Sequence, residues 1–284
     1  MGHANLFGLR ERPDFINEVL EQGGNDKVLP ELWKSITEWC RKNEVLFSIN
    51  HPFLYEWKWL YNELLLDDVS CLEIINDPTY ESVEIAHAHE ANELAVRMAD
   101  LLWADGYQIC AVGGSDSHNR IDEFYEGATE PSIAGDPATW LFMENLSARN
   151  VYGALRNCHA CITRYIDEFE IELFADEEEI YPGSEINRDA NIISWKISIK
   201  AKPYKPTLFL MIDGEKTELL IKSMDDVHYE GSGVISLPNE KYYWLRFGAA
   251  GENGEFMMYT NPIFKGTKKH SLHTFGDVKE ILGV

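Results

Sequence analysis

Residues 109–118 read ICAVGGSDSH, an apolar run followed by two glycines, a carboxylate and an imidazole. The apolar run has the length and composition of a buried β-strand. Asp116 and His118 stand two residues apart directly after it, in a loop. One oxygen ligand and one nitrogen ligand can converge there on a divalent ion. The stretch therefore predicts a strand whose end carries a metal site.

A second unit of the same kind lies upstream. Residues 45–49 are almost all apolar and run into Asn50, His51 and Pro52. Proline ends the strand and stiffens the loop that carries the histidine. Either unit alone is equally well a turn or a surface histidine. Both units nevertheless follow strand-like segments, and parallel α/β proteins carry their chemistry at the carboxyl ends of strands.

The first half of the chain alternates helical and strand-like periodicity, which predicts parallel strands covered by helices. Residues 122–136, rich in glycine, proline and acidic side chains, are expected to form an active-site loop. Ser147 is placed to cap a helix. The predicted helices span 29–43, 54–66, 80–105 and 148–157, and the predicted strands span 45–49, 69–75, 109–112 and 137–142.

From about residue 165 the hydrophobic period changes from 3.6 to 2. Residues 193–199 alternate between apolar and polar side chains, as a half-buried antiparallel strand does. Asp213-Gly214 and Asn253-Gly254 are hairpin turn signals between strand-like segments. This second half therefore predicts an all-β sandwich of immunoglobulin-like type.

Five short motifs resemble those of the PHP (polymerase and histidinol phosphatase) metallohydrolases, in the CehA/McbA-like branch. The resemblance spans most of the chain and implies an α/β fold, a partial PHP-type distorted (β/α) barrel followed by the sandwich. The barrel part would cover residues 1–164, the sandwich 165–266 and a C-terminal tail 267–284. The motifs are Gly2-His3-Ala4-Asn5-Leu6 with Gly8-Leu9, Ile49-Asn50-His51-Pro52, Leu72-Glu73-Ile74, Gly113 to His118 and Thr260-Asn261-Pro262-Ile263.

This resemblance implies a site of two or three divalent ions that activates water. Thiolates are absent from the candidate ligands, so zinc, manganese and iron all remain open. Glu73 lies between Leu72 and Ile74, which face the other way on a strand, and a buried carboxylate needs a cation or a donor beside it. The implied metal ligands are His3, His51, Asp116 and His118, of which Asp116 and His118 are also catalytic, and Glu73, Asn50, Asn76 and Ser115 are candidates for contacts with a ligand or with substrate.

The chain departs from the family at its start. Family members carry a His-x-His pair, an Asp-His pair and a ligand Glu upstream of the Gly-His that opens this sequence. The His-x-His here, His87-Ala88-His89, falls in a predicted helix, where residues two apart point about 200° apart and cannot share an ion. We therefore expect the C-terminal part of a longer protein, with an incomplete ligand set and little activity.

Composition restricts the partners. The chain has 48 acidic and 25 basic residues and a net charge of -23. This acidic excess is the reverse of the basic excess that a nucleic-acid binder needs. It has no apolar run of membrane-spanning length and no leader-like start. The five cysteines have no regular spacing, and Cys158 and Cys161 are expected to be small buried residues. A cytoplasmic protein with a small-molecule substrate is predicted.

The function predicted from these features is metal-dependent hydrolysis, and the favoured substrate is a small phosphorylated molecule. Ester or carbamate hydrolysis by the same metal site is one alternative. A non-catalytic remnant or subunit that acts as a binding module is another. A barrel without its first strands would expose edges near 45–49 and 137–142, so we also expect association with another copy or with a missing N-terminal segment.

Overall fold

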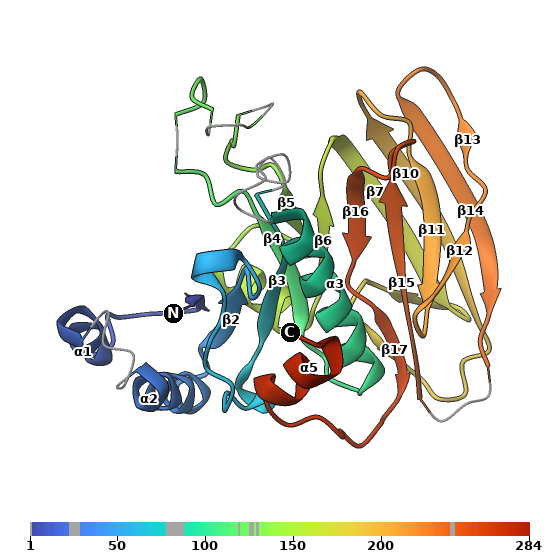
Figure 1. The fold of residues 1–284 in the computed structure, drawn as a ribbon. Coiled ribbons are helices and arrows are strands. Elements are labelled where there is room, and N and C mark those ends of the chain that lie inside the picture. Colours follow the sequence, from blue (N-terminus) through green and yellow to red (C-terminus); the bar gives the residue numbers. More distant parts are fainter. Residues whose placement is uncertain are drawn as a thin grey trace.

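The structure, a computed structural model, describes residues 2–22, 29–77, 88–118, 120–124, 128, 131–238 and 242–284. Within these residues the strands form three sheets, and helices pack against the first of them (Figure 1). This first sheet carries the residues predicted for the metal site. The described part of the chain includes no helix that is long and apolar enough to cross a membrane.

The first sheet has four strands, in the order β1, β2, β3, β4. β2, β3 and β4 are parallel, as the helix–strand alternation predicts, whereas β1 runs antiparallel to β2. His3 in β1 lies opposite Asn50 in β2, so two predicted site residues meet at one end of the sheet. The strands are β1 (His3–Phe7), β2 (Leu46–Asn50), β3 (Cys71–Asn76) and β4 (Cys110–Gly114).

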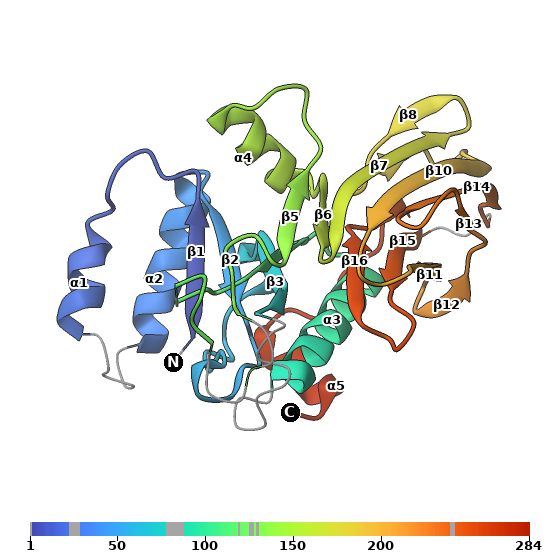
Figure 2. The same cartoon turned by 90° about the horizontal axis from the view of Figure 1, so that it is seen from above.

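Helices cover both faces of this sheet (Figure 2). Because side chains alternate along a strand, Phe47 and Leu72 enter the core with α2, α3 and α5, while Leu46 and Cys71 pack on the opposite face with Leu155 of α4. The helices are α1 (Phe15–Gln22), α2 (Leu29–Lys42), α3 (Ala88–Ala104), α4 (Ala148–Arg156) and α5 (Phe275–Leu282), with short 3-10 helices at Tyr55–Trp57 and Leu66–Asp68.

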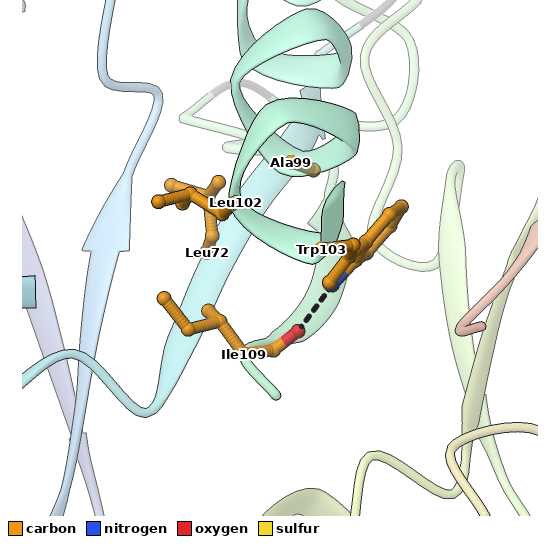
Figure 3. Close-up of a pocket in the computed structure, with 6 residues that line it drawn as sticks. Leu72, Ala99, Leu102, Trp103 and Ile109 are labelled. Atoms are coloured by element: carbon orange, nitrogen blue, oxygen red, sulfur yellow. Dashed lines mark hydrogen bonds between the residues drawn. The ribbon is translucent and has the colours of Figure 1, made fainter. Parts of the chain in front are cut away.

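The contact between α3 and the sheet is closely packed (Figure 3). Leu102 and Leu72 line a gap there that has no room for a water molecule. The indole N–H of Trp103 donates to the carbonyl of Ile109 at 3.0 Å, so the polar end of this large side chain is also satisfied. The long α3 is therefore fixed both by apolar contacts and by a hydrogen bond to the segment that leads into β4.

The other two sheets pack face to face. Trp195 of β10 lies against Phe247 of β15, with ring centroids 5.7 Å apart, in the core between them. The smaller of these sheets has five strands, in the order β13 (Lys222–Ser223), β14 (His228–Ser236), β10 (Ile192–Ala201), β7 (Ile166–Ala175) and β8 (Glu178–Ile180). The main path of the larger sheet has the order β12 (Glu215–Glu218), β11 (Thr207–Ile212), β15 (Tyr242–Ala250), β16 (Phe256–Thr260), β6 (Ala160–Thr163) and β5 (Ala138–Leu141). In the same larger sheet, β17 (Ile263–Gly266) pairs with β15, and β9 (Glu185–Ile186) pairs with β17.

The expected fold class, an α/β protein with a partial (β/α) barrel followed by an immunoglobulin-like sandwich, is wrong. Strands make up 38% and helices 22% of the structure, several sheets are antiparallel, and the described strands close no barrel. The predicted strand 137–142 appears as β5, but it pairs antiparallel with β6 and belongs to the largest sheet. That sheet contains strands from both sides of the boundary expected after residue 164.

Side chains, not another strand, complete the outer edge of β4. Its backbone groups that point away from β3 belong to Ala111 and Gly113. The amide of Asn261 accepts from the Ala111 N–H at 2.7 Å and donates to the Ala111 carbonyl at 2.9 Å. The hydroxyl of Thr139 does the same for Gly113, at 2.9 and 2.8 Å. The described parallel sheet therefore ends at β4, whose outer edge has no free backbone groups at Ala111 and Gly113 for a further barrel strand to join.

The predicted helix over 54–66 is also wrong. The described chain there has only short 3-10 helices, because its backbone is hydrogen-bonded to the C-terminal segment. The Leu66 N–H donates to the His273 carbonyl, and the Phe275 N–H donates to the Leu64 carbonyl, each at 2.9 Å. Partners more than 200 residues away override the local helical periodicity. The strand at 45–49 has β1 and β3 on its two sides, so it is not a sheet edge.

Several local predictions are confirmed. Helix α2 spans 14 residues of the predicted 29–43, and the Ser147 hydroxyl accepts from the Asn150 N–H as the N-cap of α4. The predicted helix 80–105 leaves Gly106 as the residue that ends it, and Gly106 follows α3 with a φ of 96°, as a helix-ending glycine does. All five cysteines are free and buried, as expected for Cys158 and Cys161. Residues 78–87, the start of the predicted helix 80–105, lie outside the described residues.

We predict that Asn261→Ala destabilises the fold by roughly 3 kcal/mol, because it leaves two buried backbone groups without their partner. These groups are the N–H and the carbonyl of Ala111, whereas the carbonyl of Ala160 still accepts from the backbone N–H of residue 261. Urea denaturation measures the loss. The matched control is Asn191→Ala, at an exposed position, for which we expect a change within about 0.5 kcal/mol. Equal stability of the two variants would contradict the role given to Asn261.

Candidate metal centre

The first feature of the candidate site is a contact between two histidines. The Nδ1 of His3 lies 2.9 Å from the Nε2 of His51, and the rings meet edge to face. β1 supplies the first side chain and the residue after β2 the second, and the antiparallel pairing of these strands brings them together. Because 48 residues separate the two histidines, only the sheet register could create this pair.

The distance suits two ligands of one ion. Nitrogen ligands at about 2.0–2.1 Å from a metal, at right-angle to tetrahedral geometry, lie roughly 2.9–3.4 Å apart. The same 2.9 Å suits a hydrogen bond, so a divalent ion here would replace the proton that the rings share. Burial, together with the neighbouring His3, lowers the pKa of His51, while the charge of Asp116 opposes the shift. A lowered pKa favours the neutral imidazole, which is the form that binds metals.

The backbone of His51 is held in an uncommon conformation. Its φ is 31°, a left-handed value that a residue other than glycine rarely adopts. Its N–H donates to the Oε2 of Glu73 at 2.9 Å, and the side chain is only 4% exposed. The second ring nitrogen, Nδ1, is buried and has no hydrogen-bond partner among the described residues. Glu73 therefore orients His51 through the main chain.

Glu73 lies inside the sheet next to the loop that carries Asp116. Burial raises its pKa to about 8, with a smaller contribution from the charge of Asp116, while donors from His51 and Asn76 oppose the shift. Gly114 makes room for this carboxyl, because a Cβ on Gly114 would lie 2.8 Å from the Glu73 Oε1. The second glycine of the GGSDSH stretch is thus needed for the close approach of β4 to Glu73.

Asn76 closes the network at the end of β3. Its side-chain amide donates to the Glu73 Oε2 at 3.2 Å. Asn92 of α3 holds its backbone from both sides, accepting from the Asn76 N–H at 2.9 Å and donating to its carbonyl at 3.0 Å. Asp77, the next residue, is 3% exposed and also has a positive φ, of 29°. The end of β3 is therefore rigid and polar.

Asp116 and His118 form a second pair, on the loop after β4. The Asp116 Oδ1 lies 3.2 Å from the His118 Nε2, and the His118 side chain is 75% exposed. Asp116 has a φ of 45°, the third left-handed residue at these strand ends. Ser132 holds the loop, since its hydroxyl donates to the Ser115 carbonyl and its carbonyl accepts from the Ser117 hydroxyl. Asp116 is thus close enough to influence both His51 and Glu73 electrostatically.

The four predicted metal ligands form two pairs in this structure, His3 with His51 and Asp116 with His118. Within the described residues, no group of three or more His, Cys, Asp or Glu side chains has the arrangement of a metal site. Asn50 lies beside the first pair, and its Oδ1 is buried without a hydrogen-bond partner in the described part of the chain. The histidines thus supply two donors, and any further donor requires a movement of the Asp116 loop.

Sequence reasoning missed the residues that support the site. Asn92, Ser132 and Thr139 each fix the backbone at a strand end or in the Asp116 loop. Their spacing in the sequence carries no signal, because each acts on a segment that only the tertiary fold brings near. Asp77 had a detectable signal, since it directly follows an apolar strand, as His51 does.

Comparisons with known proteins add little to this picture. No protein family and no curated protein matches the sequence. Among solved structures, an engineered protein is similar over 35% of this chain and 20% of its own, with 9% identity and a TM-score of 0.23. The chain thus corresponds to a fifth of that protein's length, and the likeness carries no argument about fold or function.

We predict that Glu73→Gln reduces the loss of stability that the metal-free protein shows as pH rises. The unfolded chain ionises Glu73 near pH 4.5, whereas the folded chain keeps the proton up to about pH 8. The folded state therefore binds more protons between these values, and its stability falls with rising pH by a few kcal/mol in total. The glutamine side chain of the variant has no proton to lose.

Urea denaturation at pH 5 and pH 8 in the presence of EDTA measures this effect. The matched control is Glu63→Gln, at an exposed position outside the network, which should keep the pH dependence of the original chain. An unchanged pH dependence in Glu73→Gln would show that the Glu73 carboxyl is not the group responsible.

Proposed function

We propose that this protein is a metal-dependent hydrolase that acts on a small phosphorylated substrate. The single observation that carries the proposal is the 2.9 Å contact between the Nδ1 of His3 and the Nε2 of His51 at the end of the four-stranded sheet. Two imidazole nitrogens that face one another, here with His51 buried and His3 exposed, are an arrangement that suits a metal ion. The phosphoester preference rests on the resemblance of the His3, His51 and Asp116 motifs to those of the PHP metallohydrolases.

The residues that would hold the ion are His3, His51 and Asp116. When bound, a divalent ion supplies water of lowered pKa and neutralises negative charge on the substrate. Glu73 orients His51 through its N–H, and Ser132 restrains the Asp116 loop. His118, which is mostly exposed and paired with Asp116, lies where it can exchange a proton with substrate. Zinc, manganese and iron all suit this set of nitrogen and oxygen donors.

Metal binding is the first test. We predict that the chain, dialysed against EDTA, binds Mn²⁺ or Zn²⁺ saturably in isothermal titration calorimetry. His3→Ala, His51→Ala and Asp116→Asn should each lower the affinity more than tenfold, because each removes a ligand. His273→Ala, at an exposed position, is the matched control and should bind as the original chain does. An affinity that stays the same in His3→Ala and His51→Ala would refute the proposed centre.

Hydrolysis is the second test. We predict slow, metal-dependent turnover of p-nitrophenyl phosphate that is lost in Asp116→Asn and retained in His273→Ala. Turnover is expected to be low because the described donors suffice for one ion. Turnover of p-nitrophenyl acetate or of an aryl carbamate without turnover of the phosphate would identify an ester or carbamate hydrolase. Metal binding without any turnover would instead favour a binding module.

A further inference from the structure

A polar pocket lies at the other end of the strands that carry the candidate metal centre. Its volume is about 360 Å³, within the range of small-molecule sites. The pocket is lined by the start of β2, by the residues just before β3 and by Gln108 before β4, whereas His51 and Asp116 follow the opposite ends of β2 and β4. It is therefore separate from the metal centre, and its contents are independent of the proposed hydrolysis.

Charged residues of both signs line this pocket, and some are better paired than others. Arg41 lies 2.9 Å from Asp68, whose side chain is only 4% exposed, so this pair forms part of the wall. Arg156 lies 3.8 Å from Glu44, and both side chains are more than half exposed. Such a long, exposed ion pair contributes little to stability, so the Arg156 guanidinium is available to a ligand anion. The carboxylate of Asp67 has no ion pair among the described residues.

The main chain adds a negative potential. Helices α2 and α4 both contribute their last turns to the pocket, through Arg41 and Arg156. The carbonyl end of a helix carries partial negative charge and attracts cations. The Tyr152 hydroxyl of α4 donates to the carbonyl of Glu44, two residues after α2, and so links α4 to the segment that follows α2. These helix ends lie beside Arg41 and Arg156 and offset part of their charge, so neither sign dominates the lining. The carboxylate of Asp67 offers a place for an ammonium group, and the Arg156 guanidinium offers one for a carboxylate.

We propose that this pocket binds a small zwitterion, a free amino acid, with its ammonium on Asp67 and its carboxylate on Arg156. An anion alone would meet three carboxylates, and a cation alone would meet two guanidinium groups. An uncharged apolar ligand would leave the exposed charges without water or a partner. A zwitterion matches both signs of the lining.

The test is thermal denaturation of the full chain with each standard amino acid in turn at millimolar concentration. We expect at least one of them to raise the melting temperature, because a ligand that binds only the folded state stabilises it. The N-acetyl and the amide derivative of that amino acid should each lose the effect, since each lacks one charge. Asp67→Asn and Arg156→Gln should each weaken its binding more than tenfold by calorimetry.

Two controls are matched to these variants. Glu63→Gln and Arg149→Gln change exposed residues outside the pocket lining, the second on the same helix as Arg156, and should bind as the original chain does. The proposal is overturned if no amino acid raises the melting temperature or if binding persists in both pocket variants. Equal binding of the amide derivative would identify a cation site, and equal binding of the N-acetyl derivative an anion site, and either would also overturn it.

Discussion

The side-chain amide of Asn261 is the interaction on which the architecture depends. It bonds to the N–H and the carbonyl of Ala111 in β4 and to the carbonyl of Ala160 in β6, and the residue is 1% exposed. An amide carries one acceptor and two donor hydrogens, so it replaces at β4 what a neighbouring strand would supply. Without it the edge would hold buried, unpaired backbone groups, or it would accept another strand.

This edge also determines how the layers meet. Gly113 lets β6 approach β4, because a Cβ there would lie 2.5 Å from a methyl carbon of Ile162. On the other side of β4, α3 is tied to the largest sheet through Arg246, which donates to both carboxylate oxygens of Asp100 at 2.9 and 3.1 Å. The four-stranded sheet and the two sheets that pack face to face therefore share buried contacts across the boundary expected near residue 164.

The sequence was informative where structure is local and uninformative where it is not. The strands ending at Asn50, Asn76 and Gly114 could be predicted because apolar runs stop at polar or glycine residues. The local sequence could not show whether a barrel closes, because closure depends on what lies beside β4. Asn261, which occupies that edge, is about 150 residues from Ala111 in the sequence. The helix over 54–66 failed for a related reason, since its backbone pairs with residues 273–275.

The candidate site shows the same division. The sequence predicted that His51 and Asp116 would lie at one end of the sheet, since each follows the end of a parallel strand, and that Glu73 would lie within the strand between them. The contact of His3 with His51 follows from β1, whose antiparallel direction the barrel prediction excluded. The pairing of His118 with Asp116, away from the other histidines, depends on the path of a loop that Ser132 restrains. Side-chain periodicity carries no information about such a loop.

The ends of the three parallel strands share one backbone property. His51, Asp77 and Asp116 all have positive φ, at 31°, 29° and 45°, where a residue other than glycine costs on the order of 1–3 kcal/mol. Hydrogen bonds of neighbouring groups hold two of them, the His51 N–H to Glu73 and the Asp77 N–H to the Gly114 carbonyl. Glycine at these three positions would relieve the strain but remove an imidazole and two carboxylates. Other residues with positive φ, such as Glu44 and Asp213, lie elsewhere in the fold, but here one follows each of three adjacent strands. Three such residues with polar side chains at one edge of a sheet are what a site selected for its chemistry, rather than for its stability, would show.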